Sequence, residues 1–162
     1  MNAYLTSFNE SERSDYLVTL AHMVGADGQV TSEEILALRT LCQRFVLGPE
    51  ERGRVMAATV GAQELPAVLQ RLGTTQLKFG LLLDLCLAAY WDHELSPEEK
   101  KELDELGSGL GASGEQVDAV LQLAAKLSKG QDFQSELEAT AALEIPREAL
   151  AMACGLEGDK PF

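Results

Sequence analysis

Two acidic segments contain the residue types that bind divalent cations. One runs from Asp27 to Glu34 and the other from Asp92 to Glu99, and each begins with an aspartate and ends with two adjacent glutamates. Carboxylate oxygens are the ligands that hard divalent cations prefer, and a histidine adds a nitrogen donor. The sequence does not name the metal, and no organic cofactor is expected. The predicted metal ligands are Asp27, Glu33, Glu34, Asp92, His93, Glu98 and Glu99.

The glutamates also have a purely structural explanation. Thr31 with Glu34, and Ser96 with Glu99, have the spacing of a capping box, in which the two side chains satisfy backbone amides at a helix start. Acidic residues in a first helical turn also interact favourably with the helix dipole. Asp27, like Asp92, is expected at the end of a helix, where the dipole is unfavourable to an acid, so each needs a loop hydrogen bond or a cation. Both explanations remain open.

An EF-hand is excluded as the form of the cation site. With Gly28 at the sixth loop position, Met23 and Gly25 occupy the first and third positions, where Ca²⁺ requires oxygen ligands. In the second segment, His93 occupies the glycine position. If a cation binds, ligands from both segments are expected to converge on it across a pseudo-twofold axis.

The two segments belong to an internal repeat, because Asp27 and Asp92 are 65 positions apart and their surroundings align at the same offset. The loop aspartate, the cap hydroxyl and the paired glutamates align, as well as the apolar positions. Chance similarity between two amphipathic helices would align the apolar positions only. We therefore predict two helix-loop-helix repeat units, residues 14–60 and 79–128.

Apolar periodicity predicts an all-α fold of seven to nine helices, in a single domain over 1–162. The first helix is expected over 16–27, and the second from Thr31 to an end at Gly48. The 76–91 helix is apolar on nearly every side and belongs at the centre of a bundle. A C-terminal extension, 131–156, is expected to cover the bundle rather than to form a dimer interface. Further helices are predicted at 49–60 and 65–72, after Ser96 and Ser113, and over 133–154 with an interruption at Pro146.

The charge limits the classes of partner. The 162 residues include 26 acidic and 13 basic side chains, which leaves a net charge of −13. Nucleic acids and anionic membranes attract clustered Lys and Arg, so we expect neither as a partner. Metal cations and basic protein surfaces are the favoured partners. Hydrophobic residues make up 46% of the chain, which excludes intrinsic disorder.

Other features predict a soluble cytoplasmic protein. The most apolar helix contains Asp84 and is too short for a membrane span; we expect Asp84 to face an edge of the bundle. The first fifteen residues resemble no secretory signal. Three cysteines without zinc-site spacing are typical of free thiols in a reducing compartment, and Cys42 and Cys86 lie on apolar helical faces, where burial is expected.

The doubled motif resembles the tellurite-resistance TerB-like family. It reads Ala26-Asp27-Gly28-Gln29-Val30-Thr31-Ser32-Glu33-Glu34, with a weaker copy at Trp91-Asp92-His93-Glu94-Leu95-Ser96-Pro97-Glu98-Glu99. The resemblance covers about 14–128. It implies an all-helical two-repeat fold, an acidic surface suspected of binding metal cations, no known catalysis and, through chaperone-linked relatives, an adaptor role. His93 in place of the motif glycine departs from the pattern.

No catalytic constellation accompanies these features. The sequence has no Gly-rich phosphate loop, no nucleophile-elbow motif and no His-Glu-x-x-His helix, so we expect no enzymatic activity. Two functional hypotheses remain. The first is a cation-binding protein in a stress or tellurite-resistance-type context, and the second is an acidic adaptor or co-chaperone-type module whose loops are structural. Whether the chain is a monomer or a homodimer stays open.

Overall fold

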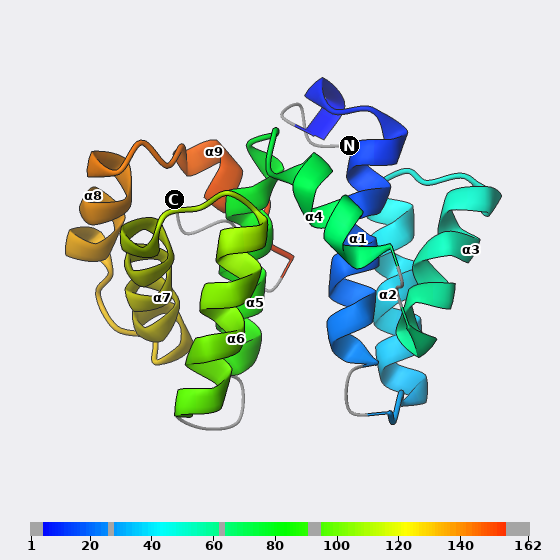
Figure 1. The fold of residues 1–162 in the computed structure, drawn as a ribbon, viewed down its shortest axis with the longest axis horizontal. Helices are drawn as coiled ribbons and strands as arrows, with labels where there is room; N and C mark the ends of the chain where they lie inside the picture. The colour runs from blue at the N-terminus through cyan, green and yellow to red at the C-terminus, as the bar shows by residue number, and fades with distance from the viewer. Residues whose placement is uncertain (1–4, 26–27, 62–63, 91–94, 155–162) are drawn as a thin grey trace. The chain divides into compact units, whose positions relative to one another are not determined.

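The computed structural model describes residues 5–25, 28–61, 64–90 and 95–154. These ranges form α-helices and two short 3-10 helices, with no strand among them, which confirms the predicted all-α fold (Figure 1). In chain order the elements are η1 Leu5–Ser7, α1 Glu10–Val24, α2 Ser32–Arg44, α3 Pro49–Ala57, η2 Ala58–Val60, α4 Leu65–Leu72, α5 Leu77–Ala89, α6 Pro97–Gly109, α7 Gly114–Ser128, α8 Gln134–Ala142 and α9 Arg147–Leu150.

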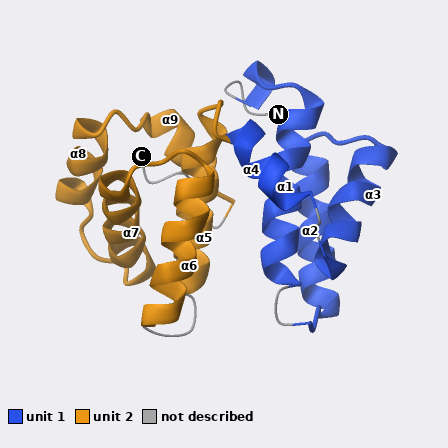
Figure 2. Ribbon diagram, viewed as in Figure 1, with its two compact units in different colours: residues 1–72 blue, residues 73–162 orange. Residues whose placement is uncertain are grey.

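The chain divides into two compact units, residues 1–72 and 73–162 (Figure 2). The boundary falls between the two repeat units that the sequence predicts, so each unit contains one helix-loop-helix repeat. Unit 1 contains α1 to α4, and unit 2 contains α5 to α9. The predicted pseudo-twofold axis concerns the relation between the units and stays a prediction.

In unit 1, α1 is the central helix and packs against α2, α3, η2 and α4. It begins at Glu10, six residues earlier than predicted, because Asn9 and Glu12 form a capping box. The Asn9 side chain accepts the Glu12 amide at 2.8 Å, and Glu12 Oε1 accepts the Asn9 amide at 3.0 Å. This extra turn and a half brings Ser14 and Asp15 into the helix, where both are buried.

In unit 2, α5 is the central helix, and nearly every side chain from Leu77 to Cys86 is buried. This agrees with the prediction of a helix that is apolar all round. α5 packs against α6, α7 and α9, while α8 packs against α7. The part of the C-terminal extension that the structure describes, 131–154, thus covers its own unit, as expected. No described helix is long and apolar enough to cross a membrane.

The two repeats share the turn between their second and third helices. After α2, Val46 adopts a left-handed φ of 54°, and after α6 the matching Gly111 has a φ of 74°. The Leu47 amide donates to the Cys42 carbonyl at 3.0 Å, the 6→1 bond of a Schellman motif, and unit 2 has the same bond at the same offset. The prediction that Gly48 ends the second helix is therefore wrong. Val46 takes the left-handed position, and Gly48 is the N-cap of α3.

Candidate acidic interaction site

Glu33 and Glu34 lie in the first turn of α2, and the structure gives Glu34 a capping role. Glu34 Oε1 accepts the Thr31 amide at 3.0 Å, and Thr31 Oγ1 accepts the Glu34 amide at 3.1 Å. The predicted capping box is thus confirmed, and it satisfies two amides that the helix start leaves without partners. Glu33 is exposed.

Glu98 and Glu99 have the same arrangement in α6. Glu99 Oε1 accepts the Ser96 amide at 3.2 Å, and Ser96 Oγ accepts the Glu99 amide at 3.1 Å. Glu98 is exposed, as is Glu33 at the matching position of α2. The second glutamate of each pair therefore caps its helix, and the first is turned to solvent.

The metal-ligand prediction is only partly accessible to the structure. Asp27, Asp92 and His93 lie outside the described residues. Within the described ranges, no group of three or more His, Cys, Asp or Glu side chains could hold a metal ion. The two glutamates in each repeat supply fewer oxygens than the six to eight that Ca²⁺ takes, so by themselves they do not complete a Ca²⁺ site. Gly28 has a φ of 78°, a left-handed turn conformation.

An unengaged acidic stripe runs along α6. Glu98, Glu102 and Glu105 are exposed, and their spacing of four and three residues places them on one face of the helix. No hydrogen bond or ion pair with a described residue engages these three carboxylates. We call them the α6 stripe. Three carboxylates on one face repel one another, so a cationic partner would bind there favourably.

A lysine network beside the stripe fixes α6 on α7. Lys100 Nζ contacts the Asp104 carboxylate at 2.7 Å and Asp118 of α7 at 3.1 Å. The hydrogen bond to Asp104 is the main reason that the pKa of Lys100 is raised, with the Asp118 carboxylate also contributing. Lys100 is thus occupied by Asp104 of α6 and Asp118 of α7 and does not pair with the α6 stripe.

The excess negative charge is concentrated in unit 2. By sequence, residues 1–72 contain nine acidic side chains and six arginines, a net charge of −3. Residues 73–162 contain seventeen acidic and seven basic side chains, a net charge of −10. The potential that attracts a basic partner is therefore strongest around the unit that contains the α6 stripe.

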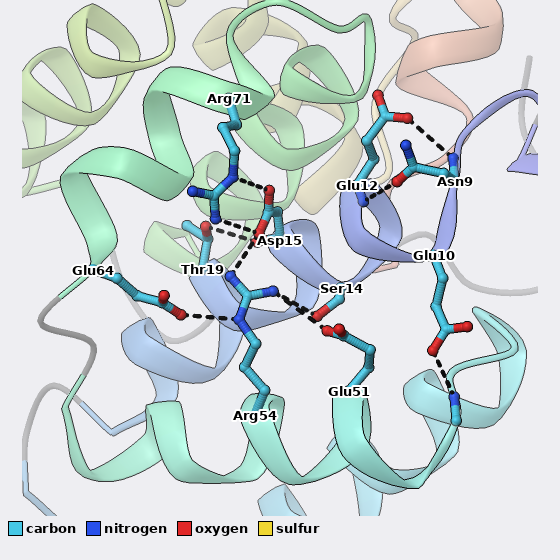
Figure 3. A network of polar contacts seen from close by, with 11 residues as sticks. Asn9, Glu10, Glu12, Ser14, Asp15, Thr19, Glu51, Arg54, Glu64 and Arg71 are labelled. Carbon is cyan, nitrogen blue, oxygen red and sulfur yellow. Dashed lines mark hydrogen bonds and ion pairs between the residues drawn. The ribbon is translucent and has the colours of Figure 1, made fainter.

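One acidic residue of unit 1, Asp15, is buried instead and has two arginine partners (Figure 3). Asp15 is 1% exposed, and both its oxygens are engaged. Arg54 Nη2 donates to Oδ1 at 2.7 Å, and Arg71 donates from Nε to Oδ2 and from Nη2 to Oδ1, each at 3.0 Å. Arg54 also contacts Ser14 at 2.8 Å and Glu64 at 2.9 Å. This Asp15 network joins α1, α3 and α4.

The Asp15 network raises the pKa of both of its arginines. Partial burial lowers the pKa of Arg54, but the hydrogen bonds and charges of Asp15 and Glu64 outweigh it and raise the pKa overall. The hydrogen bond to Asp15 raises the pKa of Arg71. The sequence alone does not indicate this network, because the predicted first helix, 16–27, leaves Asp15 outside it. The sequence signal that would indicate it is the Asn9–Glu12 capping box, which places the start of the helix at Glu10.

Asp84 is buried rather than at an edge, and the expectation of an edge position is wrong. It is 6% exposed and accepts the backbone amide of Cys154 at 2.8 Å. The buried carboxylate is tolerated because the C-terminal segment brings a hydrogen-bond donor to it. Asp84 therefore holds the end of the described chain on α5 and takes no part in the acidic surface.

Comparison with known proteins identifies the family. The family model described as "Tellurite resistance protein TerB" matches residues 13–122, which is more than half of the chain. The chain belongs to the TerB family. The match spans the capping boxes of α2 and α6 and the α6 stripe, and it ends within α7. No solved structure matches this TerB chain.

Three curated relatives are co-chaperones. The chain is 34% identical over 113 residues to the co-chaperone protein DjlA of Vibrio vulnificus (strain CMCP6). The alignment covers 64% of the TerB chain and 39% of the relative. The DjlA proteins of V. vulnificus (strain YJ016) and V. parahaemolyticus serotype O3:K6 (strain RIMD 2210633) match with the same identity, over 39% and 40% of their lengths. The TerB chain therefore spans about two-fifths of the length of these relatives.

Proposed function

We propose that this TerB chain is a non-enzymatic adaptor that docks a basic segment of a partner protein on the α6 stripe. The observation that carries the proposal is the exposure of Glu98, Glu102 and Glu105 without a partner among the described residues, in a unit of net charge −10. A row of like charges on one helix face steers and orients a cationic segment.

The comparisons support an adaptor role, since the relatives that match are named as co-chaperones, proteins that act with other proteins. Glu34 and Glu99 support it as well, because both are used as helix caps and so have a structural role without a cation. The lack of a disulfide among the described cysteines, Cys42, Cys86 and Cys154, supports the cytoplasm as the compartment.

The docking proposal is tested with a labelled synthetic peptide rich in Lys and Arg. Fluorescence anisotropy measures its affinity for the wild type and for the Glu102→Arg/Glu105→Arg variant. We expect the Kd to rise about tenfold or more in the variant, since each exposed charge pair contributes up to about 1 kcal/mol and reversal makes it repulsive. Binding should weaken with added NaCl and be unchanged by EDTA.

The matched control is Glu138→Arg/Glu144→Arg, which reverses two exposed acids of unit 2 away from α6. It changes the net charge by the same amount, so it shows how much of the effect is general attraction. Equal losses of affinity in the two variants would show that the peptide responds to net charge and not to the α6 stripe, and the proposal would fail.

Divalent cation binding by Asp27, Glu33, Glu34, Asp92, His93, Glu98 and Glu99 is our second proposal. Glu33 and Glu98 favour it, because both repeats turn these carboxylates to solvent at matching positions beside the loop segments. Isothermal titration with Ca²⁺, Mn²⁺ and Zn²⁺ should give heat of binding that is lost in Asp27→Asn/Asp92→Asn. Binding no stronger than that of an unrelated acidic protein would rule the site out.

A further inference from the structure

The second helices of the two repeats, α2 and α6, expose the same positions. Each residue of α2 matches the residue 65 positions later in α6 in its exposure to solvent, whether buried, half-buried or exposed. Leu38 and Cys42 are buried in α2, and Leu103 and Gly107 are buried at the matching places in α6. The duplicated helices therefore turn matching positions to solvent. The exposed positions are Ser32, Glu33, Leu36, Ala37, Arg39, Thr40, Gln43 and Arg44 in α2, and Pro97, Glu98, Lys101, Glu102, Asp104, Glu105, Ser108 and Gly109 in α6.

These two faces differ in charge. The α2 face has two arginines and one glutamate, a net charge of +1, whereas the α6 face has four acids and one lysine, a net charge of −3. Arg39 matches Asp104, so the sign is reversed at one exposed position. No described residue forms an ion pair with Arg39 or Arg44. In a protein of charge −13, the α2 face is thus an exposed surface of net positive charge.

The α2 face also has an apolar centre. Leu36 is 64% exposed and lies one turn from Arg39 and Thr40. In α6 the matching residue is Lys101, whose methylene stem can cover an apolar side chain while its ammonium group stays in water. The α2 face therefore combines an exposed leucine with two cationic groups. The α6 face has the methylene stem of Lys101, which can pack against that leucine, surrounded by carboxylates.

We infer that the α2 face of one copy docks on the α6 face of a second copy, so that the chain associates with itself head to tail. The partner is a second copy because the two faces have complementary charges, and unit 1, at −3, repels unit 2 less than a second unit 2 would. The two surfaces are different, so the contact is heterologous and generates rings or open chains instead of a symmetric dimer. This inference rests on the proposed function in that the α6 stripe serves as a docking face.

The ionic strength should have two opposing effects on this association. At low salt, the overall charge of −13 keeps copies apart. Near 0.1 M salt the screening length is about 10 Å, so distant repulsion is reduced while charges in direct contact still attract. At about 1 M the contact pairs are screened as well. Association should therefore be strongest at intermediate salt.

Two variants of equal net charge test the inference. Arg39→Glu/Arg44→Glu/Glu102→Arg/Glu105→Arg exchanges the charges of the two faces, so the faces remain complementary. Arg39→Glu/Arg44→Glu/Glu138→Arg/Glu144→Arg makes the α2 face acidic, leaves the α6 face acidic, and places the added arginines elsewhere. Both keep the net charge at −13, because two reversals in each direction cancel. All of these positions are exposed, and circular dichroism verifies that both variants fold.

Sedimentation velocity over a concentration series at intermediate salt is the measurement. We expect the wild type and the exchanged variant to increase in weight-average mass with concentration, and the second variant to remain monomeric. A wild type that stays monomeric at every salt concentration would overturn the inference, and so would equal association of the two variants. Peptide binding that depends on the α6 stripe in a chain that stays monomeric would overturn self-association alone and leave the proposed function standing.

Discussion

At the scale of single residues, Val46 is strained in a way that its counterpart in the other repeat is not. Its φ of 54° is unusual for a β-branched side chain, whereas the matching Gly111 adopts 74° without a Cβ. The left-handed conformation costs a non-glycine residue roughly 1–2 kcal/mol. A glycine avoids this strain but loses more backbone entropy on folding, which offsets part of the gain in stability. We therefore predict that Val46→Gly raises the free energy of unfolding by about 1 kcal/mol, measured by urea denaturation.

The reciprocal substitution is the control. Gly111→Val should lower the free energy of unfolding by about 1–2 kcal/mol, since it introduces the same strain in unit 2. Val46 is 52% exposed, so its removal sacrifices little buried surface. If both substitutions shifted stability in the same direction, the backbone explanation would be incorrect.

The thiols are a second test at the residue scale. Burial raises the pKa of the Cys86 thiol to about 12, and burial also raises that of Cys42. A raised pKa reduces the thiolate fraction at pH 8, and the thiolate is the reactive form. We predict that iodoacetamide at pH 8 labels the half-buried Cys154 first, and labels Cys42 and Cys86 only on unfolding. Peptide mass spectrometry gives the order, and early modification of Cys86 would contradict it.

At the scale of elements, the Asp15 network fixes α3 and α4 on α1. Asp15→Asn removes the charge that two guanidinium groups share. Breaking a buried ion pair costs about 3–5 kcal/mol. The Arg71 side chain is half exposed, so water can replace part of its lost interaction with Asp15. We therefore predict that the free energy of unfolding falls by about 2–3 kcal/mol. Urea denaturation measures this loss of stability.

Asp104→Asn is the control, since its pair with Lys100 is largely exposed and should contribute at most about 1 kcal/mol. Equal losses would show that burial of Asp15 adds nothing.

Local signals predicted the elements well where a short stretch of chain determines them. Thr31 and Glu34 form their capping box within four residues, and the apolar character of α5 follows from its own composition. The end of α2 was misplaced, because Gly48 is the obvious left-handed residue and a valine in that conformation is intrinsically unfavourable. Packing of Phe45 and Leu47, both 3% exposed, holds the chain on either side of Val46, and periodicity cannot show such tertiary compensation.

The candidate site was less predictable than the fold. The sequence singled out the paired glutamates by their spacing, but spacing could not separate Glu34, which caps, from Glu33, which is exposed. The Asp15 network joins residues 39 and 56 positions apart, and only the packed helices bring them together. The burial of Asp84 is unpredictable from local sequence for the same reason, since its hydrogen-bond donor, the Cys154 amide, is 70 positions away.

At the scale of the whole molecule, the uneven charge distribution should make the stability of the two units respond differently to salt. Unit 2 has a net charge of −10, so its carboxylates repel one another in the folded state, and NaCl screens this repulsion. Unit 1 has a net charge of only −3, and salt weakens the Asp15 network where Arg71 is exposed. Hydrogen–deuterium exchange at low and at moderate salt should show amides of α5 and α7 gaining protection, while those of α1 and α3 gain less or lose some. Equal changes in protection in both units would mean that the net charge of a unit does not govern its stability. The repulsion among the carboxylates of unit 2 would then already be relieved by counterions or by local pairs such as Lys100 with Asp118.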